Sequence, residues 1–370
     1  MSRAWSFSAS LGALLWFGAS SGSAFAEWRG SMRATLGPEW DSNAPRAIRG
    51  DQDARNTPVS DGLMRLTAEG EGAWRPSGRF TLDGRLLVGA KRFFGTGEVR
   101  GGVSTASEDV LTVDARVAPS LGFGRTRIEL LQGARMSRVR SGGRDYGLAR
   151  TALTVTRAVT ASVAVGVRGG ILRFDYPTDP TGSFDHTSAR AGLFGRLRLG
   201  DRWRWDVQAR ALYREYDGAG GDPDLFARDV NRRDLEGQLG TGILFRGSVQ
   251  VGLRYLWRVQ RSAAGGAVEF DRHRVSASVA FRAPGRFLVS ALGSLQFNFG
   301  QTDAVLAEAD ENQNSVQMQV RRPLSDQVSV DVRYAFYGNQ FQGGQTTGAP
   351  LEFERHTVFG GLTVFVEAAR

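Results

Sequence analysis

The sequence predicts an all-β fold: one transmembrane, antiparallel, up-and-down β-barrel of about 16 strands. Three observations predict it. Polar and apolar residues alternate at a period of two along most of the chain, short and long connections alternate between these segments, and no run of about 18 apolar residues follows residue 27. Half of every barrel strand is polar, so the whole chain keeps a polar hydropathy.

The clearest alternation lies in the segment 202–216. A transmembrane β-strand has this pattern, because its apolar face meets lipid, its aromatic residues lie at headgroup level and its polar face meets a wet lumen. The apolar face reads Trp203, Trp205, Val207, Ala209, Ala211 and Tyr213, and the polar face reads Arg202, Arg204, Asp206, Gln208, Arg210 and Arg214.

Similar segments recur at a spacing of about 20 residues per strand and connection. Short connections such as Gly200-Asp201 alternate with long ones such as 38–61, and an even strand number leaves both ends of the barrel on the periplasmic side. The predicted strands are 27–37, 62–76, 79–94, 108–119, 125–140, 147–158, 160–174, 186–199, 202–216, 232–246, 248–262, 270–283, 286–301, 312–322, 327–341 and 353–367.

The amino terminus has the features of a secretory signal peptide. A basic start is followed by the apolar run Leu11 to Ala19 and by Ala24-Phe25-Ala26, which has the small-residue form of a cleavage site. The apolar run is too short for a membrane anchor. We therefore expect a signal peptide over 1–26 and an outer-membrane β-barrel over 27–370.

The composition excludes several classes of protein. The chain has no cysteine, which removes disulfides, thiol catalysis and cysteine-ligated metals. Its net charge of +9 comes almost wholly from arginine, with Lys91 the only lysine. These charges are dispersed at alternate positions rather than clustered, so we predict no nucleic-acid partner. No phosphate-binding, dinucleotide or zinc motif is present, and we predict no cofactor.

Arginine dominates the face predicted to point inward. Guanidinium groups bind carboxylate and phosphate and select anions in pores, whereas a more conservative interpretation is that they only form cross-strand pairs with acids. The predicted pore-lining residues are Arg85, Arg116, Arg190, Arg196, Arg204, Arg210, Arg254, Arg258, Arg333, Asp83, Asp114, Asp206 and Asp331.

Aromatic residues concentrate at the strand ends, which predicts two interfacial belts. The belt at the short turns is predicted to contain Trp28, Trp74, Phe80, Trp203, Phe245, Phe281 and Phe287, and the belt at the long loops Phe93, Phe174, Tyr213, Trp257, Phe299 and Phe336.

The last predicted strand, from His356 to Val366, carries a glycine followed by spaced hydrophobic residues at Gly361, Val364 and Val366. With the signal peptide and the strand pattern, the chain resembles Gram-negative outer-membrane β-barrel proteins of the porin-like type. The resemblance implies recognition by the barrel-assembly machinery through this strand, and contact with outer-membrane lipid and lipopolysaccharide. The chain departs from the pattern at Phe359, where a polar residue is usual, and it ends on Arg370 instead of an aromatic residue.

A second, shorter resemblance lies in Trp40-Asp41-Ser42-Asn43. It is similar to a segment of β-barrel porins linked to exopolysaccharide secretion, and it equally fits an Asx-turn at the start of a loop.

Catalytic and metal-binding interpretations have less support. His186, His273 and His356 each lie beside an acid at a loop end, yet no nucleophile motif accompanies them, so we predict that the protein is not an enzyme. The loop acids have no ordered ligand spacing, and we predict no metal site. These acids are Asp217, Asp222, Asp224 and Asp229 in one loop and Asp303, Glu308, Asp310 and Glu311 in another.

Three functional hypotheses follow. The first is an outer-membrane channel with an arginine-rich lumen that passes anionic or polar solutes, in its sharper form an export conduit for an anionic exopolysaccharide. The second is a closed structural or adhesion barrel that works through its extracellular loops. The third, a hydrolase at the barrel rim, has the least support.

Overall fold

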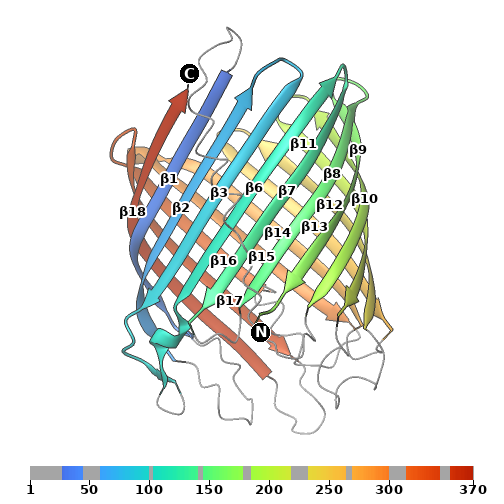
Figure 1. Ribbon diagram of the computed structural model, residues 1–370. Helices are drawn as coiled ribbons and strands as arrows, with labels where there is room; N and C mark the ends of the chain where they lie inside the picture. The colour runs from blue at the N-terminus through green and yellow to red at the C-terminus, as the bar shows by residue number, and fades with distance from the viewer. Residues whose placement is uncertain are drawn as a thin grey trace.

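A computed structural model describes residues 27–44, 59–99, 103–140, 145–177, 185–217, 232–263, 269–299, 314–341 and 351–369. Their strands form a closed antiparallel barrel of 16 strands (Figure 1), which confirms the predicted fold class. Each strand pairs with its neighbours in the sequence, and β1 closes the barrel against β18. The predicted signal peptide, 1–26, lies outside the described residues. Among the described residues, no helix is long and apolar enough to cross a bilayer.

The barrel strands follow the predicted segments closely. They are β1 (Glu27–Asp41), β2 (Asp61–Arg75), β3 (Phe80–Phe93), β6 (Val110–Phe123), β7 (Thr126–Val139), β8 (Tyr146–Ala158), β9 (Val163–Asp175), β10 (His186–Leu199), β11 (Trp203–Tyr216), β12 (Arg233–Arg246), β13 (Val249–Ser262), β14 (Phe270–Ala283), β15 (Phe287–Phe299), β16 (Asn314–Pro323), β17 (Val328–Phe341) and β18 (Leu351–Ala369).

Two strands continue past the prolines at which the sequence predicted them to end. β1 runs through Pro38 to Asp41, and β6 runs through Pro119 to Phe123. Proline has no N–H to donate, and the pairing of β1 with β18 skips Gly37 and Pro38, while that of β6 with β7 skips Ala118 and Pro119. The register is the same on both sides of each gap, so one lost pairing does not end a barrel strand.

The two ends of the barrel differ in their connections. Short turns join the strands at the end where β1 begins and β18 ends, at the top of Figure 1, and long connections join them at the other. Gly124 and Gly200 adopt φ of 59° and 63° in two of the turns, a conformation that favours glycine. The connection after β3 contains two-residue strands, β4 (Glu98–Val99) and β5 (Val103–Ser104), and a 3-10 helix at Thr105–Glu108, none of which was predicted.

The burial pattern is the reverse of a soluble protein. Apolar side chains such as Leu193 and Leu295, 62% and 57% exposed, cover the outside, while Asp234 and Asp331, each 0% exposed, lie on the inner face. Along each strand the two kinds alternate, as the pleat requires. A lipid-facing surface outside and a polar wall inside account for this inversion.

The aromatic belt at the short turns contains close outward pairs. Trp74 and Phe80 lie 6.2 Å apart in an edge-to-face arrangement, and Trp203 and Phe245 lie 4.8 Å apart. A belt of this kind anchors a barrel at the membrane interface.

The predicted belt at the long loops needs two corrections. Phe93 is 5% exposed and packs with Ala44 and Leu63, and Phe174 stacks on the buried His186 with ring centroids 4.6 Å apart. Both rings occupy inner-face positions, because their place in the strand alternation, not their place near a strand end, decides the direction of a side chain. Phe299 lies on β15, and its side chain is outside the described set.

Polar contacts fix the closure of β1 against β18. Arg355 Nε donates to Asp41 Oδ1 at 3.0 Å, and its Nη2 lies 2.5 Å from Asp41 Oδ2. Nearer the middle of the barrel, the Thr35 and Thr363 hydroxyls lie 2.8 Å apart, and Thr363 donates to Asp331. The first and last strands are thus joined by side chains on the inner face as well as by backbone hydrogen bonds.

The start of the first loop has the Asx-turn geometry. Asn43 N donates to Asp41 Oδ1 at 3.1 Å, two residues back. Trp40 and Asp41 belong to β1 and only Ser42 and Asn43 to the turn, so the segment does not follow the strand as predicted.

The face assignment makes a direct prediction for two adjacent residues of β12. Leu239, 48% exposed on the outside near the middle of the strand, should not tolerate arginine, and Leu239→Arg should lower the free energy of unfolding by about 2–4 kcal/mol. Urea unfolding in lipid vesicles, followed by tryptophan fluorescence, measures this loss.

Gln238→Arg is the matched control, because Gln238 faces inward and already donates to Glu236 at 2.5 Å. Its unfolding free energy should stay within about 1 kcal/mol of the unsubstituted protein. Equal losses from the two variants would contradict the assignment of the faces.

The seam makes a second prediction. Asp41→Ala leaves Arg355, 7% exposed, without its carboxylate, and the loss should be about 3–5 kcal/mol in the same unfolding experiment. Arg29→Ala removes the solvent-exposed pair with Glu27 at the other end of β1 and should cost no more than about 1 kcal/mol. If both variants unfold alike, the Asp41–Arg355 pair does not hold the seam.

Candidate functional site

The inner wall of the barrel carries all the residues predicted to line a pore. Register partners share a face, and the wall is continuous across neighbouring strands: Arg85 pairs with Arg116, Arg196 with Asp206, and Arg254 with Ser276. The structure separates these side chains into two groups, those held by acids and those without a carboxylate partner.

Most of the predicted residues belong to ion-pair networks. Asp114 lies 2.9 Å from Arg116 and 3.2 Å from Arg150, and Asp331 lies 2.8 Å from Arg321. The remaining predicted residues with ionic partners are Arg85 with Glu69 and Glu71, Asp83 with Arg127, Arg196 and Arg204 with Asp206, and Arg258 with Glu236. Arg333 instead lies over the ring of Phe359, 4.6 Å from its centroid, which shows that the unusual aromatic residue of the last strand points inward.

A compact network at the loop ends of β11 to β13 was not predicted as a unit. Asp234 accepts from Arg232 at 3.1 and 2.8 Å and from Ser262 at 2.7 Å, and Glu236 accepts from Arg258 at 2.8 and 3.0 Å. Both acids are almost fully buried, at 0% and 1% exposure. Neutralised in this way, they stiffen this part of the wall.

Besides Arg333, four arginines form the second group. Arg168, Arg190, Arg210 and Arg254 have no carboxylate within ion-pair distance among the described residues. Arg210 donates to Gln208 at 2.8 Å and Arg168 to Thr154 at 2.9 Å, while the buried Nε of Arg190 has no hydrogen-bond acceptor in the described part of the chain. These unpaired guanidinium groups are free to bind an anion.

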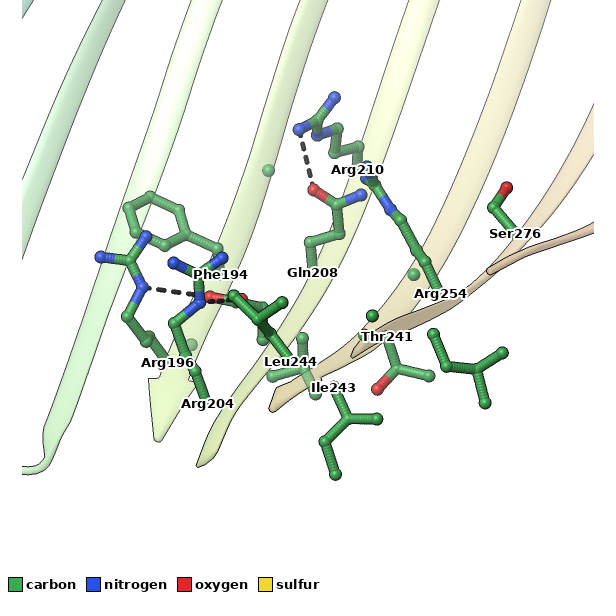
Figure 2. Close-up of a pocket in the computed structure, with 18 of the residues that line it drawn as sticks. Phe194, Arg196, Arg204, Gln208, Arg210, Thr241, Ile243, Leu244, Arg254 and Ser276 are labelled. Atoms are coloured by element: carbon green, nitrogen blue, oxygen red, sulfur yellow. Dashed lines mark hydrogen bonds and ion pairs between the residues drawn. The ribbon is translucent and has the colours of Figure 1, made fainter. Parts of the chain in front are cut away.

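The four arginines surround one cavity of about 620 Å³ in the wall formed by β9 to β14, with Leu292 of β15 at its edge. Figure 2 shows Arg210 and Arg254 on one side of it and Arg196 with Arg204 on another, with Leu244 between them and the Phe194 ring beside Arg196. Arg196 and Arg204 both contact Asp206, at 3.0 and 2.7 Å, so their charge is partly neutralised. Most of the net positive charge of the cavity therefore comes from the four unpaired arginines.

Glycines on the inner wall make room for these long side chains. A Cβ on Gly192 would lie 2.8 Å from Arg210 Cγ and 2.7 Å from the Ala209 carbonyl oxygen, and a Cβ on Gly240 would lie 3.0 Å from Gln208 Cγ. Each stem thus lies flat across a glycine of the neighbouring strand, directly opposite in register. This arrangement holds the guanidinium groups against the wall and leaves the cavity open.

A second cavity, of about 910 Å³, lies at the end with the short turns. Its charges are mixed, because Glu71, Asp83 and Glu27 line it together with Arg85 and Arg116. The β9–β14 wall therefore carries an excess of unpaired positive charge that this second cavity does not have.

Arg168 is the one arginine lining the cavity that the predicted pore-lining set lacks. The inner face of β9 carries Gly166 and Gly170 on either side of it, which weakens the alternation. The alternation of β9 could still be recognised from the outward valines Val165 and Val167, which are 44% and 49% exposed. Their positions place residue 168 on the inner face.

At the mouth of the barrel, Arg173 binds two acids, with Nε donating to Asp175 at 2.9 Å and Nη2 donating to Asp217. The hydrogen bond from Arg173 lowers the pKa of Asp217. Burial raises the pKa of Asp185, and the charges of Asp175 and Asp217 raise it further. Within the described ranges no group of three or more side chains could hold a metal ion. The other loop acids considered as ligands, Asp222, Asp224, Asp229, Asp303, Glu308, Asp310 and Glu311, lie outside these ranges.

The three histidines occupy two different environments. His273 and His356 lie on the outer surface, where their Nδ1 atoms lie 2.6 Å from the Tyr255 hydroxyl and 2.9 Å from the Tyr334 hydroxyl. His186 lies on the inner face, stacked between Phe174 and Tyr216. The two outer histidines therefore belong to the aromatic belt near the long loops.

No family model matches this sequence, and no curated protein matches it. Solved barrels are similar at low identity. A bacterial polysaccharide outer-membrane secretin is 9% identical, with 93% of this chain and 99% of that chain covered and a TM-score of 0.45. An anion-selective porin from Comamonas acidovorans is 10% identical, with 92% and 99% covered and a TM-score of 0.45. A mutant porin of Rh. blastica is 10% identical, with 92% and 100% covered and a TM-score of 0.37. Likeness at this level concerns the barrel alone.

A closed antiparallel barrel with an apolar outer surface, aromatic belts and a polar inner wall is the architecture of transmembrane β-barrels, and this protein has that architecture. Within that class it is a 16-stranded barrel with unpaired arginines on one side of its inner wall.

The glycine arrangement predicts an effect on stability. Gly192→Ala should lower the free energy of unfolding by about 1–3 kcal/mol, because its Cβ meets a backbone oxygen that cannot move aside. The outward Gly293 on β15 has nothing within 4 Å of the position that a Cβ would take, and Gly293→Ala should instead stabilise the strand by about 0.5–1 kcal/mol. Urea unfolding of the two variants in lipid vesicles compares them, and effects of the same sign would contradict the close fit at Gly192.

Proposed function

We propose that this protein is an outer-membrane channel whose lumen favours anionic solutes. The observation that carries the proposal is the set of four arginines, Arg168, Arg190, Arg210 and Arg254, which surround one cavity without carboxylate partners among the described residues. Elsewhere in the described lumen, acids neutralise most of the arginines. An anion in the lumen would therefore be attracted most strongly to this wall.

The physical basis is electrostatic. The low-dielectric wall of a barrel focuses the field of its charges into the lumen, which raises the local concentration of counter-ions. Arginine keeps its charge at all physiological pH values and binds carboxylate or phosphate through two parallel hydrogen bonds. Rings and clusters of such residues select anions in pores.

Export of an anionic exopolysaccharide is the narrower form of this proposal. A polyuronate chain would present successive carboxylates to the same arginines. Addition of a polyuronate oligomer to the conducting channel distinguishes the two forms, because a conduit for such a chain should be blocked from one side at low oligomer concentration.

A closed barrel is the second candidate, and the loop-end network around Asp234 and Glu236 favours it. The ion pairs of Asp234 with Arg214 and of Glu236 with Arg258 bring side chains of neighbouring strands together on the inner face. Such a barrel would act through its extracellular loops and would not conduct.

Single-channel recording of the refolded mature protein in planar bilayers, under a salt gradient, tests the proposal. We expect a stable open level and a reversal potential that favours chloride over potassium. Arg254→Glu and Arg204→Glu should each weaken this preference, the first more strongly because Arg254 has no acid partner among the described residues, whereas Arg204 lies 2.7 Å from Asp206.

Arg233→Gln is the matched control. Arg233 lies on the outer face, paired with Glu215 at 3.3 Å, and its loss should leave the reversal potential unchanged. A folded protein that never opens would exclude the channel and favour the closed barrel, and an open level with cation preference would contradict the proposed role of the arginines.

A further inference from the structure

The cavity in the β9–β14 wall has an apolar side as well as a charged one. Phe194, Leu244 and Leu292 line it, and all three occupy inner-face positions, where barrel strands usually carry polar residues. Leu292 is 41% exposed, although it faces the polar inside of the barrel. An exposed apolar surface within a charged wall is a feature that needs an explanation.

The apolar side chains are arranged in register. Leu244 on β12 lies opposite Gly252 on β13, Gly252 opposite Ser278 on β14, and Ser278 opposite Leu292 on β15. The two leucines therefore lie in one register row across the wall, on either side of Gly252 and Ser278. The row is at the side of the cavity nearer the short turns.

The unpaired arginines lie at the opposite side, nearer the long loops. Arg254 is two residues along β13 from Gly252 and pairs in register with Gly242, and Arg210 is two residues along β11 from Gln208. Figure 2 shows Arg210 and Arg254 together on one side of Leu244. The third apolar residue, Phe194, lies apart from the leucines. It pairs in register with Gly166 of β9, and the Arg168 guanidinium is 6.0 Å from its ring centroid. Arg204 pairs in register with Leu244, but it donates to Asp206 at 2.7 Å. The unpaired guanidinium groups and the two leucines thus lie at different ends of the cavity, which are called its charged end and its apolar end.

We propose that this cavity binds a small organic carboxylate with an apolar body. The carboxylate would be held by Arg210 and Arg254, and the apolar body would lie between Leu244 and Leu292. The cavity volume of about 620 Å³ is in the range of small-molecule sites. An inorganic anion would use only the charged end, and a sugar acid would place hydroxyl groups against the leucines, where they would lose hydrogen bonds to water.

The inference rests on the proposed function in that the ligand reaches the cavity through the lumen, and it adds a class of preferred solute. It distinguishes selection by charge, which every anion would share, from binding that also depends on apolar surface.

Isothermal titration calorimetry on the refolded full-length protein in a neutral detergent tests it, with benzoate, acetate, glucuronate and benzyl alcohol as probes. We expect benzoate to bind saturably, acetate and glucuronate to bind at least about tenfold more weakly, and benzyl alcohol to show no saturable binding. Equal affinity for benzoate and acetate, or tighter binding of glucuronate, would overturn the proposal.

Two variants locate the site. Leu292→Asn should weaken benzoate about tenfold and leave acetate unchanged, because it removes only apolar surface. Arg254→Gln should weaken both probes. Leu288→Asn, on the inner face of the same strand but outside the cavity, is the control and should leave both affinities unchanged. If Leu288→Asn weakens benzoate as much as Leu292→Asn does, the binding is not in this cavity.

These outcomes are separable from those of the channel experiment. Anion preference without discrimination between benzoate and acetate would leave the channel proposal intact and overturn this one. If the barrel discriminates between benzoate and acetate but does not conduct, the binding site is supported and its role in the passage of solutes is excluded.

Discussion

The closure of the backbone hydrogen-bond network is the constraint on which the rest of this structure depends. An unpaired backbone amide or carbonyl facing hydrocarbon costs several kcal/mol, so a sheet can cross a membrane only if it has no free edge. Here β1 meets β18, and the buried Asp41–Arg355 pair lies at the loop end of that seam. Pro38 removes a donor close to the same seam, and the closure tolerates it because the register is unchanged on both sides.

Closure also limits which side chains can lie next to one another on the inner wall. Since every strand has two neighbours, each inner-face side chain lies beside residues from two other strands, and large side chains compete for that space. Glycines relieve the competition on the β9–β14 side: the stem of Arg210 lies across Gly192, and that of Gln208 across Gly240. The cavity exists because long polar side chains lie opposite glycines of the adjacent strands in register.

The distribution of charge in the lumen follows from the same geometry. An arginine is neutralised when register brings an acid within reach, as with Arg196 and Asp206, and it stays unpaired when register brings a glycine or a serine, as with Arg254, Gly242 and Ser276. The same wall therefore has ion pairs that join its strands at the loop end, around Asp234, and unpaired arginines in its middle that are available to a ligand. The two apolar residues Leu244 and Leu292 then determine which anions would fit there.

The sequence by itself determined the fold class, the order of the strands and the face on which most side chains lie, because a period of two can be read directly from residue types when one face must be apolar. It also predicted Arg190, Arg210 and Arg254 as inward residues. It placed the strand ends at Pro38 and Pro119 too early, and it assigned Phe93 and Phe174 to the outer belt. Only the tertiary structure decided which arginines have acid partners. It also placed Arg168 beside Arg190, Arg210 and Arg254, and Leu292 at the apolar end of the cavity. Those properties depend on the register between strands. Register determines which residues of different strands lie side by side, and the spacing of residues along one strand does not reveal it.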